Sequence, residues 1–132
     1  MPVIYYVLFT VSVFPILLAF LSGYYRYREF GHFDNNNPRE QQRQQTGIGA
    51  RVVAAQHNAW ETLILFLLVT FIAFASELDM DGLAGVSLLF LVLRVLHVVC
   101  YMADWSTLRS LVYVAANLCC IYIFVIAAAN FE

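Results

Sequence analysis

The chain has 132 residues, of which 62% are hydrophobic and 12% are charged, and its net charge is −2. Soluble domains contain about 45–50% apolar and 25% charged residues, so this composition excludes an ordinary soluble domain and indicates a polytopic membrane protein. The small net charge gives no argument for a nucleic-acid partner, and the length predicts one domain over residues 1–132.

Four apolar segments predict an all-α membrane protein, a bundle of four transmembrane helices. The predicted helices cover residues 3–25, 50–76, 83–103 and 108–130, close to or above the ~20 residues that cross a bilayer. Residues 3–25 have no basic segment before them and exceed a signal-peptide core, so we expect a retained helix. In the polar residues 29–49, the segment from Gln41 to Gln45 predicts a short interfacial helix. Residues 104–107 predict a tight turn in which Ser106 or Thr107 caps the fourth helix.

The arginines are distributed unevenly among the connections. The connection between the first two predicted helices has arginines at positions 26, 28, 39, 43 and 51, and Arg109 lies beside the third connection. The charged residues of the second connection are acidic, Asp79 and Asp81. Because positive charge is enriched on the cytosolic side of membrane proteins, the first and third connections are predicted to be cytosolic, with both termini outside.

Polar side chains within the predicted second helix mark one of its faces. Arg51 lies seven residues before Asn58 and Glu61 lies three after it, so at roughly 100° per residue all three lie within one broad face. An amide and a carboxylate at the mouth of a membrane helix are costly against lipid, so we expect them to face protein or water. The alternative is that Glu61 only marks the helix end at the lipid headgroups.

The third and fourth predicted helices carry further polar residues in the same half of the membrane. Arg94, His97 and Tyr101 share one face of the third helix. Arg109 and Ser110 lie in the first turn of the fourth. Together with the carboxylate of the second helix, these residues predict a polar site among three helices, in the cytosolic half of the bilayer.

A buried arginine is rare in a membrane helix without a partner, and Arg94 has two candidates, Glu61 or a bound anion. In one alternative, Arg94 and Glu61 form an interhelical ion pair that only fixes packing. No metal site is predicted, because one histidine and one glutamate on separate helices fall short of a ligand set. The cysteines lie in apolar segments without a CxxC spacing and predict neither a disulfide framework nor a metal site; they are Cys100, Cys119 and Cys120.

Three spaced motifs give the sequence a resemblance to a known family. In chain order, on the second, third and fourth predicted helices, they are R…NxxE (Arg51, Asn58, Glu61), RxxHxxxY (Arg94, His97, Tyr101) and RSxxY (Arg109, Ser110, Tyr113). In these motifs the chain resembles the membrane-associated proteins in eicosanoid and glutathione metabolism (MAPEG), over nearly its whole length. The Asn-Asn-Pro-Arg loop resembles bacterial members most. One departure is His57, at a place where eukaryotic members usually carry an arginine.

The resemblance implies a four-helix subunit that forms a homotrimer, with glutathione as co-substrate at subunit boundaries facing the cytosol of a bacterial inner membrane. It implies two catalytic residues, Arg109 and Ser110. It also implies that Arg26, at the end of the first helix, reaches the glutathione of a neighbouring subunit. The full set of implied glutathione-binding residues is Arg26, Arg51, Asn58, Glu61, Arg94, His97, Tyr101 and Tyr113.

The chemistry of these side chains suits glutathione, which carries two carboxylates, an ammonium and a thiol. Arginines bind carboxylates through paired hydrogen bonds, and Glu61 is expected to receive the ammonium. A reactive thiol must ionise, and Arg109 is expected to supply the stabilising positive charge, with Ser110 donating a hydrogen bond to the sulfur. Neutral hydrogen bonds that orient the peptide are expected from Asn58, His97 and Tyr101.

The leading hypothesis is therefore an enzyme, a glutathione-dependent transferase or peroxidase that acts on lipophilic electrophiles dissolved in the bilayer. One alternative is a small four-helix proton-coupled exporter, whose essential carboxylate would lie near the middle of the first helix. Residues 3–25 contain no charge, which argues against it. Another alternative is a non-catalytic assembly or lipid-binding protein with the same fold. Glutathione binding separates the first hypothesis from the other two, and turnover separates a catalyst from a passive binder.

Overall fold

The computed structural model describes residues 1–131, and this part of the chain is helical with no strand. Its elements are α1 (Val3–Phe30), α2 (Pro38–Arg43), α3 (Gly47–Ala75), the short 3-10 helix η1 (Met80–Leu83), α4 (Ala84–Met102) and α5 (Ser106–Asn130). Four helical segments are long and apolar enough to cross a membrane: α1, α3, η1 with α4, and α5. The predicted all-α architecture with four membrane-spanning helices is thereby confirmed for these residues.

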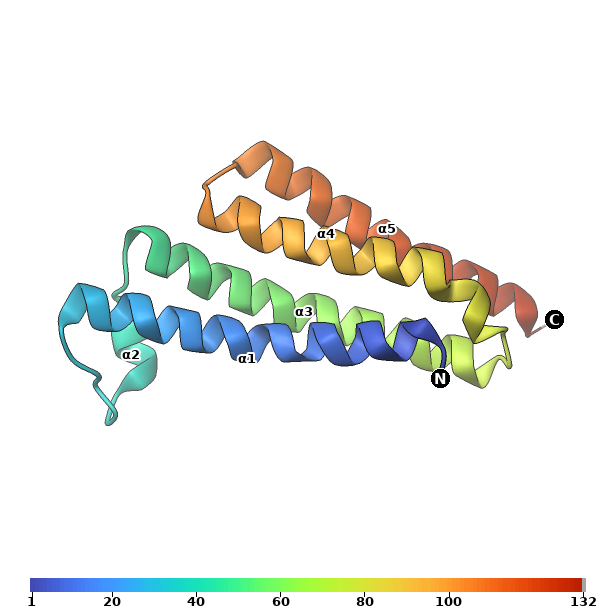
Figure 1. The fold of residues 1–132 in the computed structure, drawn as a ribbon, viewed down its shortest axis with the longest axis horizontal. Coiled ribbons are helices and arrows are strands. Elements are labelled where there is room, and N and C mark those ends of the chain that lie inside the picture. Colours follow the sequence, from blue (N-terminus) through green and yellow to red (C-terminus); the bar gives the residue numbers. More distant parts are fainter. Residues whose placement is uncertain (132) are drawn as a thin grey trace.

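The four long helices run up and down along one common direction (Figure 1). Helix α3 contacts α1, α4 and α5, and α4 also contacts α1 and α5. The N-terminus, the C-terminal helix end and residues 76–83 lie at one end of the bundle. Helix α2 and the turn between α4 and α5 lie at the other, which we call the α2 end. The first and third connections thus share one end, as alternating helix directions require.

The first membrane helix is longer than hydropathy predicts. Helix α1 continues to Phe30 rather than ending at residue 25, so Arg26 and Arg28 lie within its last turns. It ends where Gly31 adopts a left-handed conformation with φ of 77° and donates its N–H to the Tyr27 carbonyl at 2.8 Å. Long arginine and tyrosine side chains keep a polar tip in water while their stems lie along apolar surface, so a helix can extend beyond its apolar run.

The fourth membrane helix begins earlier than predicted. Helix α5 starts at Ser106 instead of residue 108, and its N-cap is Trp105, with no side-chain hydrogen bond to the first turn. The prediction that Ser106 or Thr107 caps this helix is therefore wrong, because both residues already lie inside it. The other predicted membrane-helix ends shift by three residues or fewer.

Two clusters of buried apolar side chains join the helices. The larger lies toward the termini and includes the stacked rings of Phe66 and Phe90, whose centroids are 4.1 Å apart. The smaller lies toward the α2 end and joins Leu18 of α1 to Ala55 and Ala59 of α3. Lipid tails are as apolar as these side chains, so close van der Waals packing, which small residues permit, holds the bundle together.

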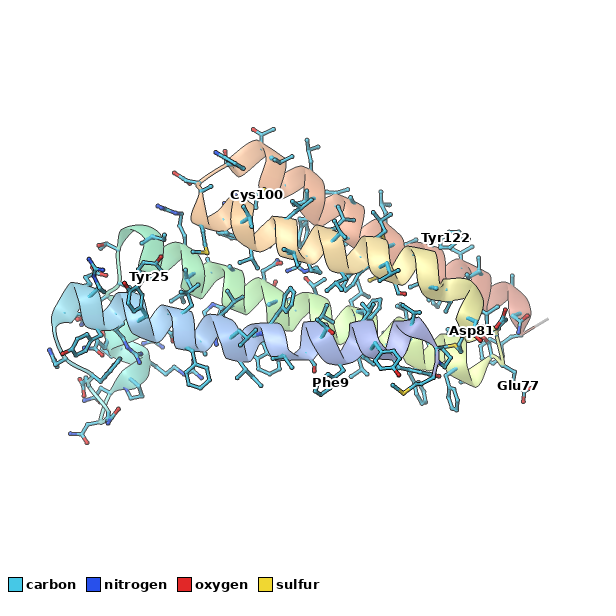
Figure 2. All side chains as sticks on the ribbon, viewed as in Figure 1. Phe9, Tyr25, Glu77, Asp81, Cys100 and Tyr122 are labelled. Atoms are coloured by element: carbon cyan, nitrogen blue, oxygen red, sulfur yellow. The ribbon has the colours of Figure 1, made fainter. Side chains whose placement is uncertain are left out.

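The outside of the bundle is also apolar. Phe9 is 72% exposed and points away from the helices in Figure 2. Phe20, on the same helix, is 75% exposed. The acidic residues Glu77 and Asp81 lie at the end that carries the termini (Figure 2). An apolar exterior with charges near its ends is the surface that a lipid-embedded bundle presents.

The polar segment between α1 and α3 is fastened to the bundle by a glutamine. A short helix is present near the one predicted at Gln41–Gln45, but α2 starts earlier, at Pro38, and ends at Arg43. Just after it, the buried Gln45 accepts a hydrogen bond from the Ser22 hydroxyl and donates one to the Ser22 carbonyl, both at 3.2 Å. Gly49 provides the space, because a Cβ there would lie 2.6 Å from Gln45 Nε2. These bonds tie the segment that follows α2 to α1.

Helices α3 and α4 end in the same kind of turn, with an acidic residue in the left-handed region. Glu77 follows α3 with φ of 57°, and Asp104 follows α4 with φ of 60°. After α4, Trp105 donates its N–H to the Cys100 carbonyl at 2.9 Å, and Asp104 donates to Tyr101 at 3.2 Å. This is the Schellman motif, in which the left-handed residue is usually glycine. It reverses the chain within a few residues and brings the start of α5 beside the end of α4.

We predict that Glu77→Gly stabilises the protein. Glycine adopts the left-handed conformation without the steric cost of a Cβ, so the free energy of unfolding should rise by about 1 kcal/mol. Thermal unfolding in detergent measures the difference. Glu77→Ala is the matched control, because alanine removes the carboxylate but keeps the Cβ. Equal stability of the glycine and alanine variants would show that the left-handed turn is not strained.

Candidate functional site

A polar hollow lies among α3, α4 and α5 toward the α2 end of the bundle. Its volume is about 260 Å³. Each of the three helices contributes to its wall, so it depends on the packing of all three. The residues that line it, called the polar hollow below, are Asn58, His97, Tyr101, Arg109, Ser110, Tyr113 and Val114. Six of these are sequence-predicted site residues, and the structure brings them together.

Arg109 occupies the wall of the hollow formed by the start of α5. It is the fourth residue of that helix, and its N–H donates to the Trp105 carbonyl at 2.9 Å. The Arg109 guanidinium carbon lies 4.5 Å from the centroid of the Tyr101 ring, on α4. This cation–π contact, made possible by the short turn at Asp104, holds the guanidinium beside the hollow. The helix N-terminus adds its own partial positive charge at the same place.

Ser110 lines the hollow next to Arg109, but its hydroxyl already donates a hydrogen bond within α5. Ser110 Oγ donates to the Ser106 carbonyl one turn earlier, at 3.1 Å. Serine side chains in helices commonly make this local bond. A hydrogen bond from Ser110 to a ligand sulfur therefore requires the hydroxyl to rotate away from Ser106.

His97 and two tyrosines form an aromatic wall. The His97 ring meets the Tyr101 ring edge-on, with centroids 5.2 Å apart, and the Tyr113 ring lies 6.2 Å away. His97 is only 2% exposed. Its Nδ1 is buried and has no hydrogen-bond partner among residues 1–131. His97 therefore lines the hollow with its ring, while its Nδ1 is enclosed by the surrounding helices.

Arg94 lies behind the hollow instead of in its wall. It is 2% exposed, and its Nη2 donates a hydrogen bond of 2.7 Å to Asn58 Oδ1 on α3. The interhelical ion pair between Arg94 and Glu61 does not form, because the Glu61 side chain is exposed and the ion pair in the described part of the chain is Arg43 with Glu40. The amide of Asn58, one turn away, takes the place of the carboxylate.

Three other predicted site residues lie outside the hollow. Arg51 donates from Nε and Nη2 to the Met102 carbonyl at 3.3 and 3.2 Å, and so binds the last residue of α4. Arg26 donates from Nη1 to the Pro38 carbonyl at 3.2 Å, at the start of α2. Glu61 is exposed on the outer side of α3. Within one subunit, these residues do not converge on the hollow.

Sequence reasoning missed Thr62. Its Oγ1 donates to the Asn58 carbonyl at 2.9 Å and lies 3.4 Å from Asn58 Oδ1. Thr62 is buried, 4% exposed, and supports the side of Asn58 that faces Arg94. The spacing of four residues in a helix is the signal for such a contact, since threonine often bonds the carbonyl one turn back.

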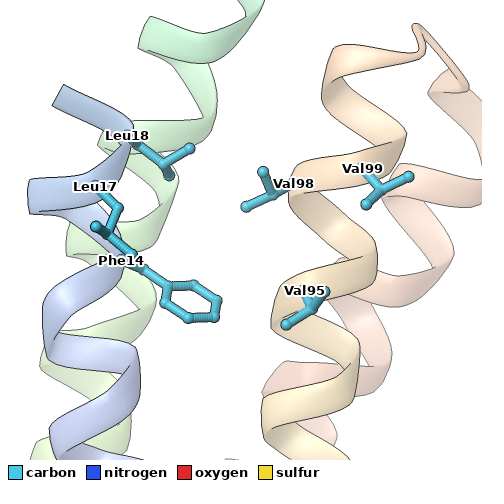
Figure 3. A pocket seen from close by; sticks show the side chains of 6 residues that line it. All are labelled: Phe14, Leu17, Leu18, Val95, Val98 and Val99. Atoms are coloured by element: carbon cyan, nitrogen blue, oxygen red, sulfur yellow. The ribbon is translucent and has the colours of Figure 1, made fainter. Parts of the chain in front are cut away.

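A second hollow, wholly apolar, lies between α1 and α4 (Figure 3). Its volume is about 190 Å³. Val98 directly follows His97, so this hollow lies at the level of the polar one but on a different face of α4. No residue lines both. The side chains around the apolar hollow are Phe14, Leu17, Leu18, Val95, Val98 and Val99.

The cysteines and acidic residues that the structure describes do not form a metal-binding cluster. Within residues 1–131, no group of three or more His, Cys, Asp or Glu side chains is placed to hold a metal ion. All three cysteines are free and buried: Cys100, Cys119 and Cys120. The donor set of the hollow, with an arginine, an amide and hydroxyl groups, suits an organic anion better than a cation.

Comparison with known proteins gives one clear result. No curated protein and no solved structure matches the chain. The model of the MAPEG family matches residues 3–129, which is nearly the entire sequence and includes all four membrane-spanning helices. The chain therefore belongs to the MAPEG family, membrane proteins associated with eicosanoid and glutathione metabolism.

Proposed function

We propose that this protein is a glutathione-dependent transferase or peroxidase, and that it activates the glutathione thiolate against lipophilic electrophiles from the bilayer. The observation that carries the proposal is the position of Arg109. Its guanidinium is held over Tyr101 at the N-terminus of α5 and lines a polar hollow. Membership of a glutathione-associated family supports glutathione as the thiol.

The first chemical task in this proposal is to ionise the thiol. A free thiol has a pKa of about 8.5, and nearby positive charge lowers it, so that more thiolate is present at neutral pH. Arg109 and the partial charge of the helix N-terminus both stabilise the anion from one side of the hollow. The thiolate then attacks the electrophile. Ser110 can assist only by giving up its bond to Ser106.

The second task is to hold the rest of glutathione. We propose that Glu61 receives the ammonium and that Arg51 and Arg26 bind carboxylates. These three side chains lie outside the hollow, so a ligand that meets them must extend across the subunit surface. Glu61 is also an exposed carboxylate on a membrane helix, and exposure to lipid would be costly. A second copy beside α3 would remove that cost, which supports a homotrimer with glutathione at subunit boundaries.

We propose that the protein lies in a bacterial inner membrane, with its α2 end facing the cytosol and both termini outside. The arginine-rich first connection supports this orientation. The exporter alternative is not favoured. An exporter would need a carboxylate near the middle of α1. The one acidic residue of α1, Glu29, lies at the end of the helix and accepts a hydrogen bond of 2.6 Å from the Thr46 hydroxyl.

The test of the function is a glutathione titration of the protein purified in detergent, with thiolate absorbance in the ultraviolet as the readout. Binding with thiolate formation supports the proposal, and turnover of a lipophilic electrophile or peroxide identifies a catalyst. Binding without turnover of either substrate class would favour a passive binder. No binding would exclude a glutathione enzyme.

We predict that Arg109→Ala lowers thiolate formation and turnover much more than it lowers glutathione affinity. Glutathione affinity should fall less than about tenfold, because the other contacts remain, whereas turnover should fall roughly 100-fold or more, as on removal of one charge-stabilising donor. The pH midpoint of thiolate absorbance should rise. Arg109→Lys should restore part of the effect.

Arg43→Ala is the matched control for Arg109, since Arg43 is an exposed arginine at the same end of the bundle, paired only with Glu40. It should behave as wild type. An Arg109→Ala variant that ionises glutathione at pH 7 and turns over normally would contradict the assignment.

We predict that Glu61→Gln weakens glutathione binding by about ten- to a hundredfold. The lost interaction is a charge-assisted hydrogen bond to the ammonium, of about 1.5–3 kcal/mol. Isothermal titration measures the affinity, and Glu40→Gln on α2 is the control. If Glu61→Gln instead weakens the assembly in detergent and binds glutathione normally, Glu61 serves packing only.

We predict that a cysteine at Asp81 is labelled by an impermeant thiol reagent from outside intact cells. The background replaces the three buried native cysteines. A cysteine at Asn36, in the first connection, should be labelled only after the membrane is opened. The reverse pattern would overturn the orientation and with it the cytosolic placement of the hollow.

A further inference from the structure

Arg94 contributes nothing directly to the wall of the polar hollow, although it is the one arginine buried within the membrane-spanning part. Its Nη2 donates to Asn58 Oδ1 at 2.7 Å, and its Nη1 is buried without a partner among the described residues. Asn58, in contrast, does line the hollow. The influence of Arg94 on a ligand must therefore pass through Asn58 or through the packing of α3 on α4.

The chemistry of this contact fixes the orientation of the Asn58 amide. A guanidinium has hydrogen-bond donors only, so the atom that faces it must be the amide oxygen. Thr62 adds support on the same side, with its hydroxyl 3.4 Å from Asn58 Oδ1. The amide nitrogen, which only donates, is the polar atom that Asn58 has left for a ligand.

Other groups around the hollow can donate to the same kind of ligand atom, although the tyrosine hydroxyls and the His97 imidazole can also accept. Arg109 donates only, and the tyrosine hydroxyls can donate. Among residues 1–131, no carboxylate lines the hollow, and Glu61 of α3 is exposed. The hollow thus offers donors from three helices and no anionic acceptor for an ammonium group.

We propose that Arg94 is a positioning residue that acts through Asn58, and that Asn58 donates to an acceptor group of the ligand. This inference rests on the proposed function and makes it more specific. A carboxylate or peptide carbonyl of glutathione lies at Asn58, and the ammonium group of glutathione lies outside the hollow. A free amide could rotate and present either atom. The buried arginine removes that choice and makes the site selective for acceptors.

The experiment compares glutathione affinities in a double-mutant cycle of Arg94→Met and Asn58→Ala. If Arg94 works through Asn58, each single change weakens binding about tenfold, and Arg94→Met has no further effect once Asn58 is alanine. Asn58→Asp sharpens the test. It keeps an oxygen for Arg94 but replaces the nitrogen donor with a second oxygen, so the protein should remain stable and lose at least tenfold in affinity.

Phe90→Leu is the matched control for packing. Phe90 lies one turn before Arg94 on α4 and stacks on Phe66 of α3, away from the hollow. The substitution should lower the thermal stability and leave glutathione affinity unchanged. If Arg94→Met does not fold, Arg94→Lys keeps a donor for Asn58 Oδ1 and should bind within about threefold of wild type. Independent, additive losses in the cycle, or an Asn58→Asp variant that binds normally, would overturn the proposal.

A readout without glutathione separates this inference from the proposed function. The side-chain amide signals of Asn58 are followed by NMR in asparagine-labelled protein and assigned by their loss in Asn58→Asp. Arg94→Met, or Arg94→Lys as the milder change, should shift these signals, and Phe90→Leu should not. If the wild type binds no glutathione but the signals respond, the proposed function fails and the positioning role stands. Unchanged Asn58 signals in both Arg94 variants would overturn the positioning role.

Discussion

A guanidinium buried among membrane helices must find an acceptor, and the bond from Arg94 to Asn58 satisfies that requirement. It links α3 to α4 across the middle of the bundle, so the two helices cannot rotate independently about their axes. Once α3 and α4 are set in this way, Asn58, His97 and Tyr101 share one hollow, and α5 completes it. The arrangement of the polar hollow thus depends in part on the acceptor that this buried guanidinium finds.

Much of this fold follows from the sequence, because the bilayer imposes simple constraints. A helix must satisfy its own backbone, and about 20 apolar residues are needed to cross, so composition alone predicts four spans. Their ends are harder to predict. Helix α1 continues beyond its apolar run, where Arg28 is exposed and Arg26 donates to the Pro38 carbonyl. Helix α5 starts at Ser106 because the turn at Asp104 ends at Trp105, which takes the N-cap position.

The candidate site was predictable in part. Helical spacing shows which residues share a face, and this was enough to bring His97, Tyr101 and Arg109 to one hollow. Spacing does not show which neighbour a side chain meets. Glu61 was therefore a reasonable partner for Arg94, yet the shorter side chain of Asn58 lies in the better position. The hydrogen bond of Gln45 to Ser22 was beyond sequence reasoning as well, because it depends on the space that Gly49 leaves.

The contact between Arg51 and Met102 has an electrostatic consequence for the whole α2 end. An antiparallel neighbour places its negative carbonyl end beside the positive end of α5, and two opposed helix dipoles partly cancel. Here the last carbonyls of α4 are occupied: Ala103 and Asp104 bond to Val99 and Tyr101, Trp105 bonds to Cys100, and Arg51 bonds to Met102. The first turn of α5 has no side-chain cap. The Arg51 guanidinium offsets the partial negative charge at the end of α4, while the first turn of α5 keeps its free N–H groups. The partial positive charge at the start of α5 is therefore less opposed by its neighbour and favours an anion beside Arg109.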